Sequence, residues 1–167
     1  SAMVESTGSA RRLLPTRAAA TRKAAVGAAS RHLAAIGYLI EDEDLKERCS
    51  DLLKARRNFD RAVREATTVL DARLRRLCQI RDRLNPADLV GRTLHPGKAL
   101  LRVSSDYGEQ EGFFFVCKGL MQAFRNPSHH QLNDRLTRED ALRLCGFVDL
   151  LLRKLGTAQV APQDGTT

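Results

Sequence analysis

Residues 58–80, NFDRAVREATTVLDARLRRLCQI, combine apolar and basic side chains at the spacing of an α-helix. The apolar positions recur three and four residues apart, which gathers them on one helical face. They are Phe59, Ala62, Val63, Ala66, Val69, Leu70, Leu74 and Leu77. Arginines fall mostly on the other positions. The stretch therefore predicts a helix with a core face and a basic face.

Two other segments upstream of this helix also have helical character. Residues 16–40, TRAAATRKAAVGAASRHLAAIGYLI, are rich in alanine, the residue with the highest helix propensity, and we expect Gly37 to end that helix. The acidic sequence EDEDL from Glu41 is typical of a helix start, because carboxylates stabilise the positive end of the helix dipole.

Downstream, residues 109–124, EQEGFFFVCKGLMQAF, predict the most apolar helix of the chain. Its expected core face comprises Phe113, Val116, Cys117, Leu120, Met121 and Phe124. The last helix is predicted in residues 137–156, with Thr137 and Asp140 as a capping pair and Gly156 as the stop. Its expected core face comprises Ala141, Leu144, Cys145, Val148, Leu151, Leu152 and Leu155.

Residues 85–108 contain two prolines and little periodicity, so they predict a connector. Asn85 before Pro86 predicts one short helical turn, and His95 before Pro96 is expected to be extended, because the proline ring clashes with a helical predecessor. No segment shows strand alternation. The sequence therefore predicts an all-α protein, an antiparallel helical bundle with an additional N-terminal alanine-rich helix.

The 167 residues suffice for one compact folding unit. Residues 1–15 are expected to be a flexible tail, whose first three residues are interpreted as the remainder of a cleaved tag. Residues 16–54 are expected to be a helical extension, 55–156 the helical domain and 157–167 a disordered tail. No apolar run approaches the roughly 20 residues that cross a bilayer, and no signal peptide is evident, so we expect a cytoplasmic protein without a membrane partner.

Four cysteines are widely separated, without a CxxC pair or a neighbouring histidine, and each lies in or beside an apolar helical stripe. They predict buried thiols rather than a zinc site. No cofactor or metal is expected. The formal net charge of +8 attracts polyanions and makes nucleic acid the leading partner, although arginine-rich solvated helices without any partner show the same charge.

The sequence AFRNPSHH, residues 123–130, concentrates the chemistry of the chain. Pro127 disfavours helix at Asn126, so the preceding helix should finish at about Arg125, and the following turn could return His130 towards it. An arginine offers fixed donors to a phosphate, and a histidine exchanges protons near neutral pH. RNA can be cleaved with these functions alone, because its 2′-hydroxyl is an internal nucleophile. By spacing alone this is weak evidence, since a histidine after a turn is commonly a capping or packing residue.

The sequence GLMQAFRNPSHH, with EQEG before it and FDRAVREATTVLDARL upstream, resembles the C-terminal domain of the Ymh-type conserved bacterial and phage proteins, a branch of the HEPN (higher eukaryotes and prokaryotes nucleotide-binding) superfamily. The resemblance covers about residues 55–155. The superfamily motif is an arginine, usually followed by a polar residue, and then a histidine after four to six intervening positions. Arg125, Asn126 and His130 match this motif, whereas His129 lies one position too early.

The resemblance implies a helical bundle that dimerises so that two motifs line one composite cleft. In active members it implies a metal-independent endoribonuclease of toxin–antitoxin or other defence systems, with an antitoxin or a sensor protein as a further partner. By analogy, Arg125 contacts the scissile phosphate, His130 transfers protons and Asn126 orients the site. The alanine-rich segment has no clear place in the minimal family domain, and could be a dimerisation or recruitment arm.

Two other interpretations remain open. The first is a catalytically silent helical module that binds nucleic acid or a protein, because a charge of +8 alone provides phosphate contacts. The second is an oligomeric scaffold held together by the alanine-rich helix and the Phe113 helix. Removal of His130 would abolish cleavage in the nuclease and hardly change binding in the silent module.

Overall fold

The computed structural model describes residues 17–125 and 135–162. These residues form six α-helices, a π-helical turn and two short strands. The helices are α1 (Arg17–Leu39), α2 (Glu43–Lys54), α3 (Asp60–Cys78), α4 (Pro86–Leu94), α5 (Tyr107–Leu120) and α6 (Arg138–Gly156). The π-turn η1 (Met121–Arg125) continues α5. The predicted all-α class is confirmed.

Side-chain caps fix where the helices begin. The Asp42 carboxylate accepts from the Leu45 backbone N–H at α2, and the Asn85 carbonyl oxygen accepts from Asp88 at α4. The predicted pair Thr137 and Asp140 forms a full capping box at α6. The sequence predicted a single helical turn after Asn85, whereas α4 extends for nine residues.

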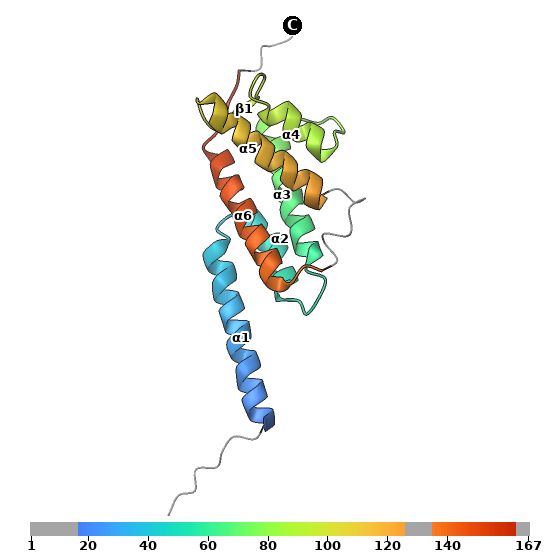
Figure 1. The fold of residues 1–167 in the computed structure, drawn as a ribbon, viewed down its shortest axis with the longest axis vertical. Helices are drawn as coiled ribbons and strands as arrows, with labels where there is room; N and C mark the ends of the chain where they lie inside the picture. The colour runs from blue at the N-terminus through green and yellow to red at the C-terminus, as the bar shows by residue number, and fades with distance from the viewer. Residues whose placement is uncertain (1–16, 126–134, 163–167) are drawn as a thin grey trace, which may run out of the picture.

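The core surrounds α3, which contacts α2, α4, α6 and η1 (Figure 1). Of its eight predicted core residues, six are buried, while Phe59 and Leu77 are half-buried and pack against the core. Burial of these side chains, each contributing about 1.5–3 kcal/mol when large and fully enclosed, is the main stabilising term of the bundle. Leu70 and Leu74 are fully inaccessible to solvent.

Helix directions differ from a strictly antiparallel bundle. α2 runs antiparallel to α3, to which residues 55–59 connect it, but α3 and α6 run in the same direction (Figure 1). Arg138 at the start of α6 bonds the carbonyls of Leu53 and Ala55, close to where α3 begins. In sequence, α5 comes between α3 and α6, and it runs in the opposite direction to both (Figure 1). The chain therefore returns through α5 to the end of the bundle at which α6 begins.

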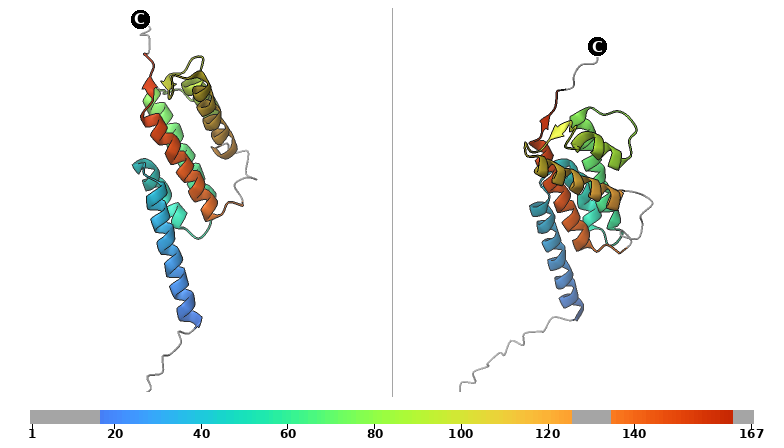
Figure 2. Two further views of the ribbon diagram at one scale, coloured as in Figure 1. Left: turned by 60° about the vertical axis from the view of Figure 1, so that its left-hand side comes forward. Right: turned by 45° about the horizontal axis from the view of Figure 1, so that its top comes forward.

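α1 extends beyond the other helices, as Figure 2 shows from two sides. It contacts the bundle near its C-terminal end, where Ile36 is buried, and it ends at Leu39, two residues beyond Gly37. α2, by contrast, buries Leu45, Cys49 and Leu53 completely. Packing therefore places α2 inside the bundle, whereas the sequence had grouped residues 16–54 as one extension.

The segment after Gly156 also differs from the expectation of a disordered tail. Gln159–Val160 form strand β2, which pairs antiparallel with β1 (Leu101–Arg102). The Ala161 N–H donates to the Leu100 carbonyl at 2.8 Å and extends the pairing. Two-residue strands carry too little alternation to be recognised in a sequence. Residues 163–167 lie outside the described part.

The buried face of α5 is rotated relative to the prediction. Phe114, Cys117, Leu120 and Met121 are buried, whereas Phe113 is half-buried and Val116 is 41% exposed. Gln110 explains the rotation, because its buried amide donates to the carbonyls of two preceding segments, Leu94 and Leu101, and accepts from Val103 N–H. These tertiary bonds hold the Gln110 and Phe114 side of α5 inwards.

Candidate functional site

Arg125 lies at the last position of η1, where the sequence places the end of the Phe113 helix. α5 passes into this π-turn at Met121, whose side chain is buried and whose N–H donates to the carbonyls of Cys117 and Lys118. π-turns are rare in proteins, and those that occur are often located at functional sites. The wider turn sets the direction in which Arg125 leaves the helix.

A hydrogen-bonded chain ties Arg125 to α3. Its Nη1 donates to the Thr68 Oγ1 at 2.7 Å, and the Thr68 hydroxyl donates to the Arg64 carbonyl at 2.8 Å. Because the Thr68 hydroxyl donates its proton to the backbone, its oxygen lone pairs are available to accept from the guanidinium. Thr68 lies 57 residues before Arg125, and nothing in the sequence pairs them.

Within the described part of the chain, the guanidinium of Arg125 is only partly hydrogen-bonded. Its Nε is buried and has no hydrogen-bond partner among the residues that the structure describes. An unpaired buried donor is costly, typically about 1–3 kcal/mol, and more when it carries charge. Such an atom marks a position where a ligand oxygen or an adjoining segment of chain is expected.

The other two predicted site residues, Asn126 and His130, lie outside the described residues. The structure brings Arg125 together with Thr68, and the meeting of Arg125 with His130 stays a prediction. Thr68 is the site residue that sequence analysis missed. The only signal was a pair of hydroxyl residues, Thr67 and Thr68, in a helix made mainly of alanine, leucine and arginine.

The outer face of α5 leads towards this site and is apolar. Gly112, Phe115, Val116 and Gly119 follow one another at helical spacing, and Phe115 is 59% exposed. A Cβ atom added at either glycine would meet nothing within 4 Å. The next residue of the same face is Gln122, which is exposed on η1.

The cysteines, all within the described residues, form no disulfide and are buried, as predicted. Burial raises the pKa of Cys78 to about 11 and that of Cys117 to about 12. The pKa of Cys145 is also raised, first by its hydrogen bond with Cys49 and then by burial. Because the thiolate is the reactive form, the thiols of Cys78, Cys117 and Cys145 are poor nucleophiles near neutral pH.

Within residues 17–125 and 135–162, no three His, Cys, Asp or Glu side chains are grouped so that they could hold a metal ion. The helices in this part of the chain all lack the combination of length and apolar character needed to cross a membrane.

Comparison with known proteins gives a single family. The model of a family described as "Protein of unknown function (Hypoth_ymh)" matches residues 41–155. The match begins at the N-terminus of α2 and ends within the last turn of α6, so it covers the bundle and leaves out α1. No curated protein and no solved structure matches the chain.

Proposed function

Because the chain belongs to the Hypoth_ymh family and holds Arg125 by Thr68 with its Nε unpaired among the described residues, we propose that it is a metal-independent endoribonuclease of the HEPN type. Arg125, Asn126 and His130 are its site residues, and two copies of the chain form the composite site. The partly satisfied guanidinium is the observation that carries the proposal. A phosphate oxygen would supply the missing acceptor.

The chemistry needs three functions. A base removes the proton from the ribose 2′-hydroxyl, whose oxygen forms a bond to phosphorus as the bond to the 5′-oxygen breaks. An acid gives a proton to that leaving oxygen, so the products carry a 2′,3′-cyclic phosphate and a 5′-hydroxyl. His130 serves in proton transfer, Arg125 stabilises the charge that develops on the phosphate, and Asn126 orients the site.

A homodimer fits the exposed face of α5. Two glycines flanking Phe115 and Val116 allow a second helix to approach closely and bury both apolar side chains. Since this face continues through Gln122 towards Arg125, association there would bring two motifs to one surface. Phe115→Glu should halve the mass measured by light scattering from twice 18.6 kDa to the single chain. A wild-type monomer would contradict the composite site.

Cleavage of a mixed RNA in EDTA tests the activity. We expect the wild type to generate 2′,3′-cyclic phosphate ends, and Arg125→Ala and His130→Ala to lose them. Arg61→Ala is a matched control, because Arg61 is exposed on α3 and forms no ion pair with a described residue. Cleavage that persists in both site variants would reject the proposal.

The second candidate is a silent module that binds nucleic acid or a protein, and the net charge of +8 favours it. Salt-sensitive RNA binding without cleavage in the wild type would select this function. For the nuclease, we further propose a role as a cytoplasmic toxin or defence effector, restrained by an antitoxin or a sensor protein. Expression of the wild type should arrest growth, and expression of Arg125→Ala should not. Co-expression of the partner with the wild type should restore growth.

A further inference from the structure

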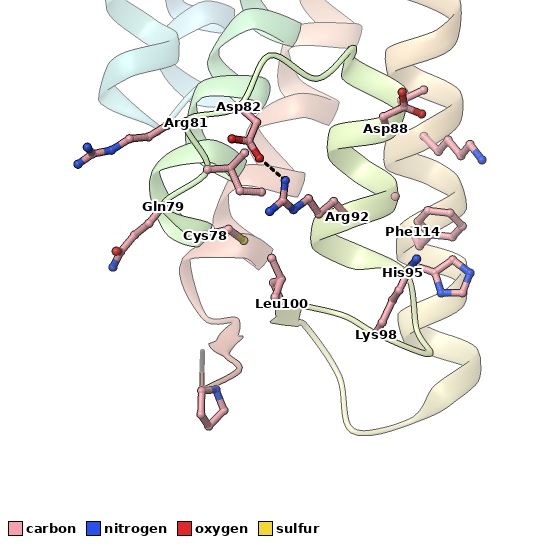
Figure 3. Close-up of a pocket in the computed structure, with 15 residues that line it drawn as sticks. Cys78, Gln79, Arg81, Asp82, Asp88, Arg92, His95, Lys98, Leu100 and Phe114 are labelled. Atoms are coloured by element: carbon pink, nitrogen blue, oxygen red, sulfur yellow. Dashed lines mark hydrogen bonds and ion pairs between the residues drawn. The ribbon is translucent and has the colours of Figure 1, made fainter. Parts of the chain in front are cut away.

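A groove of about 1030 Å³ opens between the end of α3, α4, the loop after α4 and α5 (Figure 3). Neither Thr68 nor Arg125 is among its lining residues. Four of its lining residues are cationic, Arg81, Arg92, Lys98 and Lys118, and two are acidic, Asp82 and Asp88. The balance between them decides what the groove can hold.

Both carboxylates are already engaged. Asp82 pairs with Arg92 across the groove, as the dashed line in Figure 3 shows. Asp88 accepts from the Asn85 side-chain amide in the first turn of α4. Among the residues that the structure describes, no carboxylate pairs with the remaining three cations, Arg81, Lys98 and Lys118. Arg92 and Asp82 offset each other, but Asp88 keeps its charge because its partner is a neutral amide. Three unpaired cations and one carboxylate leave the lining of the groove with a net positive charge.

The wall around α5 holds Lys118 and His95 against the buried ring of Phe114 and adds a further donor. Lys118 lies over the Phe114 ring at 5.4 Å, and His95 meets that ring edge-on at 5.3 Å. The His95 Nδ1 accepts from the Gly97 N–H at 3.2 Å, which leaves its Nε2 as the protonated nitrogen of the neutral ring. Nε2–H can donate to a phosphate oxygen.

The groove continues towards the candidate active site. A second hollow shares Ala87, Asp88 and Lys118 with it and extends to Met121 and Gln122 of η1. Lys118 thus lies where the two hollows meet. A polymer placed along both would reach the turn that ends in Arg125.

We infer that this groove holds the RNA strand on one side of the scissile bond, through phosphates at Arg81, Lys98 and Lys118. The inference rests on the proposed function, because the strand is the substrate of the Arg125 site. RNA fits better than a small anion for two reasons. The three cations come from separate segments, the residues after α3, the loop after α4 and α5, and the labelled Arg81 and Lys98 lie apart in Figure 3. Phosphates recur regularly along a strand, which suits separated cations.

Gly91 offers a way to block the groove without changing its charge. It lies on the groove side of α4, and a Cβ atom added there would meet nothing within 4 Å. Packing therefore does not require glycine. A larger side chain at this position would project into space that the strand occupies, while the helix itself would gain propensity.

Fluorescence anisotropy with a 2′-O-methyl RNA 12-mer tests the inference without cleavage, since the nucleophilic hydroxyl is blocked. We expect the triple variant Arg81→Ala, Lys98→Ala, Lys118→Ala to raise Kd at least about tenfold at physiological salt. The slope of the logarithm of the association constant against the logarithm of the salt concentration should become shallower by about 2. Each single-strand phosphate contact contributes roughly 0.7 to this slope, and the variant removes three contacts. The charge-matched control is Lys23→Ala, Arg61→Ala, Lys154→Ala, outside the groove.

Equal weakening by both triple variants would overturn the inference, because it would show diffuse attraction only. Gly91→Leu should also raise Kd, whereas Gly37→Leu, at another helical glycine with open space, should not. An unchanged Kd in Gly91→Leu would exclude the groove as the binding path.

The two proposals fail in different ways. If groove variants bind as the wild type does while ordinary RNA is still cut through Arg125, the groove is wrong and the nuclease stands. If the groove variants lose binding but no protein generates 2′,3′-cyclic ends, the groove stands as an RNA-binding site and the nuclease is wrong.

Discussion

Arg125 and Arg138 are both half-buried arginines near a helix end, but the protein satisfies them very differently. Arg138 donates through Nε to the Leu53 carbonyl at 2.9 Å and through Nη2 to the Ala55 carbonyl at 2.7 Å. Its guanidinium also lies over the Phe59 ring at 5.2 Å. Arg125 has a bond to Thr68, and its buried Nε has no partner among the described residues.

The difference separates a structural arginine from one available to a ligand. Arg138 connects α6 to the end of α2. Its planar guanidinium donates to the Leu53 and Ala55 carbonyls, which are left without helical partners at the end of α2. Arg125 is oriented by α3 but keeps donors that the described protein does not use. A guanidinium held in this way needs little reorganisation to bind a phosphate, which is what preorganised electrostatic catalysis requires.

The largest effect on stability is expected at Arg138. Arg138→Ala leaves the Leu53 and Ala55 carbonyls without their donor and should lower the free energy of unfolding by about 3 kcal/mol. Arg125→Ala removes one bond to a hydroxyl and should lower it by about 1 kcal/mol or less. Urea denaturation of both variants measures the contrast. Equal losses would show that Arg125 is also structural.

The next effect is expected at Asp149, a buried carboxylate that is satisfied like Arg138. Its Oδ1 accepts from the backbone N–H groups of Glu41 and Asp42 at 2.8 Å, and its Oδ2 accepts from Arg153 at 3.1 Å. Asp149→Ala leaves both N–H groups unpaired and should destabilise by about 2 kcal/mol. Asp149→Asn, which keeps one acceptor oxygen, should cost less in the same denaturation assay.

A substitution of Thr68, which accepts the hydrogen bond of Arg125, tests whether Arg125 must be oriented in order to act. Thr68→Val keeps the shape and a similar helix propensity but removes the acceptor, so the guanidinium is retained and its orientation is lost. We expect kcat to fall about tenfold, or about 1.4 kcal/mol, with KM and the melting temperature little changed. Thr68→Ser should restore the rate. A rate unchanged in Thr68→Val would remove this positioning role.

The smallest effect concerns pH at the start of α6. Hydrogen bonds from Thr137 hold the pKa of Asp140 below its ordinary value of 3.8. Because the folded pKa is the lower one, this contribution is fully present above pH 3.8 and is lost as pH falls through the folded value. Thermal unfolding from pH 6 to 2 should therefore show an acid-side loss that is smaller in Asp140→Asn. Identical profiles would contradict the capping role.

Local features of the fold could be predicted because their causes are local. The caps at Asn85 and Thr137 depend on residues three positions apart, and the α3 core face depends on periodicity within one helix. The rotation of α5 could not be predicted, because Gln110 is held by carbonyls of other segments. The same applies to β2, whose partner lies at Leu101–Arg102.

The candidate site divides in the same way. Arg125 could be singled out from its place before Pro127, and the structure puts it at the end of η1. Thr68 could not, since a contact across 57 residues exists only in the folded chain. The groove cations were recognisable only as part of a net charge, because their pairing depends on tertiary neighbours such as Asp82.

Single-turnover cleavage of one defined RNA in EDTA, with Arg125→Ala and Arg138→Ala measured side by side, tests the central claim most directly. At a temperature where both variants are folded, we expect Arg125→Ala to be at least about 100-fold slower than the wild type. Arg138→Ala should stay within a few-fold of it. Wild-type cleavage by Arg125→Ala, or equal loss in the two variants, would contradict the assignment of Arg125 to the phosphate.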